Sequence, residues 1–139
     1  MKNKRSKGEL DRFRVNRIEL KRKYLWLEVI VFSRPGYMAR GSYHLGINAR
    51  NTMGLWRPVF PKDVRINRGR IGTMRLVRGR NLELIAMHES VHAAFGLSAY
   101  RKRWPVDGDD REEFIARVAE YIFGQIQRRL RVMNYYRYT

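Results

Sequence analysis

The sequence predicts an α+β domain, with a small antiparallel or mixed sheet in the N-terminal half followed by two packed helices. Short runs of aromatic and β-branched residues occupy the first half, whereas apolar residues recur at helical spacing in the second half. Strands followed by helices are typical of the α+β class. The 139 residues have the length of one domain. We expect residues 1–12 to form a basic flexible tail and residues 13–139 the folded domain.

Four stretches before residue 78 favour strands, and the strand-like pattern begins at Phe13. Residues 24–32 are aromatic and β-branched, and they stop at the turn signal Ser33-Arg34-Pro35-Gly36. Residues 42–48 alternate loosely between polar and apolar side chains, so they can pair with this first strand. Residues 50–70 contain several glycines and prolines and are expected to be mostly loop, with one short strand. Residues 71–77 are the last predicted strand.

Two helices are expected after these strands. Asn81 can cap the first helix, and Gly96 can close it. A polar loop of about ten residues follows. Asp109 or Asp110 can then cap the second helix. Apolar residues at helical spacing between positions 114 and 130 give this second helix a broad apolar face, by which it can pack.

The first helix contains the pattern H-E-x-x-H at His88-Glu89-Ser90-Val91-His92. Residues four apart lie one above the other on a helix, so both imidazoles can bind the same metal ion. Glu89 is rotated by about 100° from His88, which places its carboxylate beside the open coordination position. There it can take a proton from a coordinated water, whose pKa zinc lowers to about 7. The pattern predicts one Zn²⁺ per chain, with His88 and His92 as ligands and Glu89 as the catalytic base.

The neighbours of the two histidines support a shared partner. Both imidazoles are flanked by apolar residues, namely Leu84, Ile85, Val91 and Phe95. We therefore expect them on the apolar, buried side of the helix. Buried polar groups are costly unless they are paired, so two imidazoles one turn apart would need a common ligand. The chain has no cysteine, so any zinc must be held by histidine and carboxylate.

A catalytic zinc needs a third protein ligand and an open position. His92 is the last histidine of the chain, so the third ligand is expected to be a carboxylate on the second helix. Glu113 is the preferred candidate. Glu112 and Glu120 are alternatives, either as the ligand or as a group that orients a ligand. Placement on a helical wheel does not decide among the three.

Two further parts of a peptidase site have candidates. A developing oxyanion needs a nearby donor, and Tyr100, Arg117 and His44 are the candidate transition-state stabilisers. A peptide substrate can bind in extended form by adding to the edge of a sheet. Residues 71–77 come directly before the predicted active-site helix and are the strand expected to bind it.

Residues 84–93, together with Glu113-Phe114-Ile115-Ala116, resemble the small gluzincin-type metallopeptidases that are common in phages and prophages. Those proteins pair an H-E-x-x-H-A helix with a later helix carrying E-x-x-A, and they are loosely similar to the ImmA/IrrE and SprT-like peptidases. The resemblance covers roughly residues 71–126. It implies a minimal zincin-like fold that hydrolyses peptide bonds of a protein substrate. It also implies the two histidines and Glu113 as zinc ligands and Glu89 as the base.

The charge of the chain indicates a second kind of partner. Thirty Lys and Arg against thirteen Asp and Glu give a formal net charge of +17, which favours polyanions. Several basic runs are interleaved with aromatic residues, as at Lys21-Arg22-Lys23-Tyr24. Arginine with stackable rings suits phosphate contact and single-strand stacking. Nucleic acid is therefore a candidate partner, in addition to a protein or peptide substrate.

No membrane partner is expected. The basic start of the chain is not followed by an apolar stretch. The longest apolar run, residues 24–32, is far shorter than the ~20 residues of a membrane helix. We expect a cytoplasmic protein, located in the host cytoplasm or associated with the virion if a phage encodes it.

An alternative function stays open at this point. The chain can be a basic nucleic-acid-binding or virion-associated protein whose zinc site is structural or inactive. Glu89 separates the two hypotheses, because a purely structural zinc site has no use for a carboxylate at that helical position.

Overall fold

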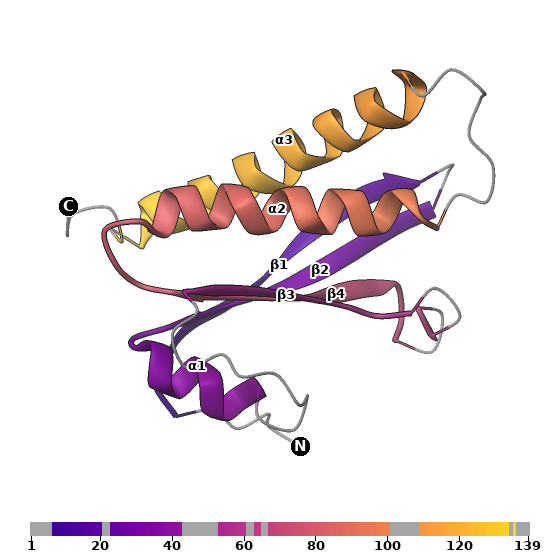
Figure 1. The fold of residues 1–139 in the computed structure, drawn as a ribbon. Coiled ribbons are helices and arrows are strands. Elements are labelled where there is room, and N and C mark those ends of the chain that lie inside the picture. The colour runs from indigo at the N-terminus through magenta and orange to yellow at the C-terminus, as the bar shows by residue number, and fades with distance from the viewer. Residues whose placement is uncertain are drawn as a thin grey trace.

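The fold is an α+β arrangement of a four-stranded mixed sheet and helices, which confirms the predicted class (Figure 1). The computed structural model describes residues 7–20, 23–42, 53–60, 63–64, 67–100, 109–133 and 135. The described strands occur in the order β1-β2-β4-β3 across the sheet.

The first two strands form an antiparallel hairpin. Strand β1 (Glu9–Leu20) pairs with β2 (Lys23–Phe32) from Glu9 opposite Phe32 to Leu20 opposite Lys23. β1 thus begins inside residues 1–12, the range expected to be a tail. Alternation along β2 puts four buried apolar side chains on one face of the sheet. They are Leu25, Leu27, Val29 and Val31.

The other two strands complete the sheet. β3 (Gly54–Pro58) is the short strand expected between residues 50 and 70, and β4 (Arg70–Val77) is the strand expected over 71–77. β4 is parallel to β2 and antiparallel to β3, so its backbone is paired on both sides. The expectation that residues 71–77 form the peptide-binding edge is therefore wrong. Among the described strands, β3 is the edge strand on this side of the sheet.

A short helix replaces the turn that Ser33-Arg34-Pro35-Gly36 indicated. α1 (Pro35–Ser42) begins at Pro35, because the fixed φ and missing N–H of proline suit the first turn of a helix. It packs against one end of the sheet, on the face opposite the long helices (Figure 1). The pairing expected for residues 42–48 falls on residues 43–50, which lie outside the described part of the chain.

Two long helices cover the other face of the sheet (Figure 1). α2 (Leu82–Ser98) follows Asn81 as expected, and α3 (Asp109–Val132) begins at one of the two expected aspartates. α2 and α3 run antiparallel, because Arg111 contacts Ser98 at one end and Gln127 contacts Glu83 at the other. Three fully buried apolar residues of α3 belong to the core between the helices and the sheet. They are Ile122, Ile126 and Leu130.

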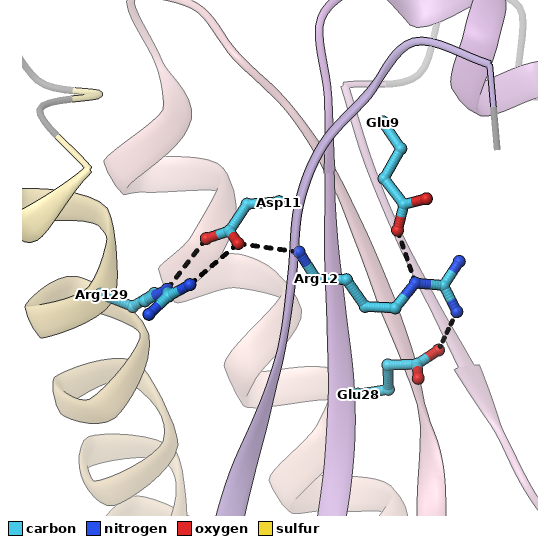
Figure 2. Close-up of polar contacts among 5 residues, drawn as sticks. All are labelled: Glu9, Asp11, Arg12, Glu28 and Arg129. Carbon is cyan, nitrogen blue, oxygen red and sulfur yellow. Dashed lines mark hydrogen bonds and ion pairs between the residues drawn. The ribbon is translucent and has the colours of Figure 1, made fainter. Parts of the chain in front are cut away.

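An ion pair connects the first strand to the last helix. Asp11, which is 4% exposed, accepts hydrogen bonds from Arg129 Nε at 2.9 Å and Nη2 at 3.0 Å. Figure 2 shows the same carboxylate accepting the backbone N–H of Arg12. This bidentate pair contributes to stability more than an ordinary surface pair, because its carboxylate is almost fully desolvated.

None of the described helices combines the length and the apolar composition of a membrane-spanning helix.

Candidate metal centre

The H-E-x-x-H pattern lies within α2, and its two histidines converge. Nε2 of His88 is 3.1 Å from Nε2 of His92. The ring centroids are 4.7 Å apart and the rings are nearly perpendicular, at 77°. Two nitrogens bound to one tetrahedral zinc at about 2.0–2.1 Å lie about 3.3–3.4 Å apart. The pair is therefore close to the geometry of two ligands on one ion. The same separation also permits a hydrogen bond between a donor and an acceptor tautomer.

The two histidines are exposed, which corrects the expectation that they are buried. The apolar residues around them are exposed as well. The exposed fractions are 61% for Leu84, 47% for Met87, 48% for Val91 and 57% for Phe95. The expectation was wrong because α2 is apolar on nearly all sides, so apolar neighbours did not identify the side that faces the core. The imidazoles are consequently accessible to a metal ion and to a substrate.

Glu89 has a different environment from the histidines. It is 7% exposed and points toward the edge strand β3, where Gly54 leaves room for it. A Cβ atom at Gly54 would lie 3.1 Å from Glu89 Cγ and 2.4 Å from Ile85 Cγ2. The backbone N–H of Trp56 donates to the Glu89 carboxylate. The side chain of Glu89 thus lies between α2 and strand β3.

Burial raises the pKa of Glu89 above its ordinary value, because it penalises the charged carboxylate. The nearby charges of His92 and His88 and the hydrogen bond from Trp56 oppose this shift. A carboxylate with a raised pKa holds a proton more strongly than an exposed one. The environment therefore suits a proton acceptor, which is the role expected for Glu89.

The carboxylates proposed as third ligand do not gather at the histidine pair. The contacts of Arg111 with Ser98 and of Gln127 with Glu83 show which positions of α2 and α3 lie side by side. Along the helix axis, Glu113 is then at the height of Gly96, and Glu120 is at the height of Ser90, between the two histidines. The Glu113 side chain is 69% exposed and forms an ion pair with Arg117 at 3.8 Å. Glu112 and Glu120 are also exposed. Within the described part of the chain, no three histidines or carboxylates form a group that could hold a metal ion. The third ligand stays a prediction.

Two of the three candidate transition-state stabilisers lie within the described residues. The Tyr100 hydroxyl donates to the carbonyl of Val59 at 2.5 Å, and burial raises its pKa to about 12. Arg117 is exposed beside Glu113. His44 lies outside the described residues.

Sequence reasoning missed the part that β3 plays in the site. Gly54 and Trp56 contact Glu89 from a strand some thirty positions earlier in the chain, and no local pattern specifies such a contact. The only signal available was Gly54 itself, since a glycine within a strand often marks close approach of another segment.

Neither the family models, nor the curated proteins, nor the solved structures contain a match to this chain. The functional argument therefore rests on the residues of the site.

Proposed function

We propose that the chain is a zinc-dependent metallopeptidase that hydrolyses peptide bonds of a protein substrate. His88 and His92 hold the metal, and Glu89 acts as the catalytic base. The observation that carries the proposal is the convergence of the two Nε2 atoms, which lie 3.1 Å apart. The buried carboxylate of Glu89 belongs to the same turn of helix. The donor set fits zinc, because neutral imidazole is among its common ligands and the spacing is near that of a shared ion.

The position of the edge strand supports a peptide as substrate. β3 pairs with β4 along one side only, so its other side can accept an extended peptide by strand addition. Glu89 lies next to this strand, at Gly54 and Trp56. A peptide bound along β3 would pass close to the proposed base, and the exposed apolar residues of α2 can contact its side chains.

The chemistry divides between the metal and the chain. When bound, zinc supplies the Lewis acidity that activates water and polarises a peptide carbonyl. Glu89 accepts the proton of the attacking water and delivers it to the departing amine nitrogen. Its burial limits exchange of that proton with bulk solvent. Among the carboxylates of α3, the resemblance implies Glu113 as the third ligand, while the alignment of the helices favours Glu120.

Zinc content by elemental analysis is the first test. The wild type, purified without chelators, should contain one zinc per chain, and His92→Ala should contain none. Glu113→Ala and Glu120→Ala distinguish the two candidate third ligands, because only loss of the true ligand lowers the zinc content. A wild type without zinc, or a His92→Ala variant that keeps it, would exclude the site.

Activity on a quenched fluorescent peptide library is the second test. Glu89→Gln should keep its zinc and lose hydrolysis by about 10²- to 10⁴-fold, the usual contribution of a general base. Glu83→Gln is the matched control, since Glu83 lies on the same helix and contacts Gln127 instead of the histidines. Equal activity of Glu89→Gln and wild type would favour the alternative, a nucleic-acid-binding protein with an inactive zinc site.

A further inference from the structure

The face of the sheet opposite α2 and α3 carries a cluster of charged side chains. α1 covers one end of this face, where Ile30, Phe32, Met38 and Val77 are buried together. Arginines of three strands lie on this face, and Arg70 shares it with Arg75 because a register irregularity interrupts the alternation of β4. We call this set the open-face arginines: Arg12 and Arg14 on β1, Arg57 on β3, and Arg70 and Arg75 on β4. The cluster therefore spans the full width of the described sheet.

Arg75 lies at the centre of the cluster. Its Nη1 is buried and has no hydrogen-bond partner among the described residues. The pKa of Arg75 is lowered, first by burial and then by the like charge of Arg57, with smaller contributions from Arg12 and Arg70. Only Glu28 acts in the opposite direction. Burying a guanidinium nitrogen without a hydrogen-bond partner among like charges costs free energy, so the positive charge of Arg75 is only partly compensated.

The carboxylates near the cluster are already engaged. Arg12 donates to Glu9 and, at 3.3 Å, to Glu28 (Figure 2). These two ion pairs use the acidic groups at the β1 side of the sheet. Arg57 and Arg75 lie on the β3 side, and neither forms an ion pair with a described residue. The uncompensated positive charge is therefore greatest around Arg75.

Aromatic rings accompany the arginines on the same face. The guanidinium of Arg14 stacks on the ring of Trp26 at 4.0 Å from its centroid. Tyr24, two residues earlier on β2, is 71% exposed. Because side chains two apart share a face, Tyr24 and Trp26 both lie on the open side of the strand. Tyr24 is thus the exposed ring of this face, and an exposed ring beside arginines suits the binding of an unpaired base and its phosphate.

We propose that the open face of the sheet binds the phosphate backbone of single-stranded nucleic acid, with Arg57, Arg70 and Arg75 contacting phosphates and Tyr24 stacking on a base. The sheet is wide enough for several contacts, since four strands cover about 14 Å between the outer strand axes. An anionic bilayer fits less well. Membrane-surface sites insert several large apolar side chains, and Tyr24 is the only exposed one on the described strands. This site lies on the opposite side of the sheet from the zinc site and does not depend on it.

Fluorescence anisotropy with a labelled 20-nucleotide single-stranded DNA tests the proposal. The open-face variant combines Arg57→Gln, Arg70→Gln and Arg75→Gln. The control variant combines Arg80→Gln, Arg128→Gln and Arg131→Gln, three exposed arginines outside the sheet. Both variants lower the formal net charge from +17 to +14, so a loss caused by net charge alone would be equal in the two.

The open-face variant should bind on the order of 100-fold more weakly at 0.1 M salt, and the slope of log affinity against log salt should fall by about 2, as expected for three lost contacts to a single strand. The control variant should lose much less. Equal losses in the two variants, or no loss in the open-face variant, would overturn the proposal. Duplex DNA and single-stranded RNA of the same sequence show which type of nucleic acid the face prefers. Stronger binding of the duplex than of the single strand would also overturn the proposal.

Two single variants separate a binding role from a structural one. Arg75→Met should weaken DNA binding without lowering the melting temperature, because Nη1 has no hydrogen-bond partner among the described residues and burial and the nearby arginines outweigh the attraction of Glu28. Glu28→Gln should strengthen binding by removing the opposing charge. A lower melting temperature of Arg75→Met, or weaker binding of Glu28→Gln, would contradict the assignment. Binding to vesicles of phosphatidylserine and phosphatidylcholine, without binding to any of the nucleic acids, would replace it by a membrane site.

Discussion

On one face of the sheet, α2 and α3 cover a continuous apolar core, whereas the described part of the other face is covered at one end only, by α1. On the covered side, the candidate site residue Glu89 lies where α2 meets β3. The open face carries charged side chains, some of them partly buried, instead of a continuous apolar core. Because strand side chains alternate, neighbouring residues of one strand serve these two different purposes.

The largest predicted difference between the faces concerns two neighbours on β2. Leu27 is fully buried under the helices, so Leu27→Ala should lower the free energy of unfolding by about 2–5 kcal/mol. Glu28 points to the open face and accepts one hydrogen bond from Arg12, so Glu28→Ala should cost no more than about 1 kcal/mol. Urea unfolding followed by circular dichroism measures both. Similar costs for the two variants would show that the open face is buried in solution.

Two glycines give the next largest contrast. Gly72 faces α2, and a Cβ atom there would lie 2.5 Å from the carbonyl oxygen of Arg57 and 2.5 Å from the Trp56 ring. Gly72→Ala should therefore cost about 1–3 kcal/mol of unfolding free energy. Gly124 in α3 has nothing within 4 Å of such an atom, so Gly124→Ala should be stabilising by roughly 0.5–1 kcal/mol through helix propensity. Thermal unfolding of both variants checks the order, and a stable Gly72→Ala variant would contradict the close packing of β3 on β4.

The class of fold could be predicted because the hydrophobic period changes along the chain. Asn81 and the pair Asp109-Asp110 mark the helix starts in sequence, and α2 begins directly after Asn81 and α3 at Asp109. The end expected at Gly96 is wrong, because α2 continues to Ser98. The pairing of β1 with β2 was missed, since the sequence between them, Lys21-Arg22, contains no glycine or proline that would indicate a turn. Residues 9–12 read as a tail because they are mostly charged. Their role in β1 depends on Arg129, a partner 118 positions away that no local pattern specifies.

The candidate site was predictable to a similar extent. The four-residue spacing of His88 and His92 determines that their rings meet, and this follows from helix geometry alone. The exposure of the two rings depends on which side of α2 packs on the sheet. The place of Glu89 beside β3 depends on strand order. Both are tertiary properties, so the motif predicted the local geometry and left its surroundings open.

A smaller difference is expected between two neighbouring residues of β1. Asp11→Asn breaks the bidentate pair with Arg129 on the covered face, which should cost about 1.5–3 kcal/mol of unfolding free energy, at the lower end because Arg129 is partly exposed. Arg12→Gln breaks the pairs with Glu9 and Glu28 on the other face and should cost a similar amount, about 1.5–3 kcal/mol, because the Glu9 side chain is fully buried as well. Asp11→Asn measured alone and together with Arg129→Gln gives the coupling energy. A coupling near zero would show that the pair does not form in solution.

The smallest predicted effect concerns Tyr100, which joins the end of α2 to the residue after β3. Tyr100→Phe removes the hydrogen bond to the Val59 carbonyl and should cost about 0.5–1.5 kcal/mol at pH 7. Burial raises the pKa of Tyr100 from 10.0 to about 12, so the folded chain keeps this proton longer than the unfolded chain does. The stability that depends on this proton is fully present below pH 10 and is lost as the pH rises toward 12. The advantage of wild type over Tyr100→Phe should therefore shrink between pH 10 and pH 12 in urea unfolding. Lysines and the other tyrosines titrate equally in both proteins, so a difference that stays constant over this range would show that Tyr100 is exposed.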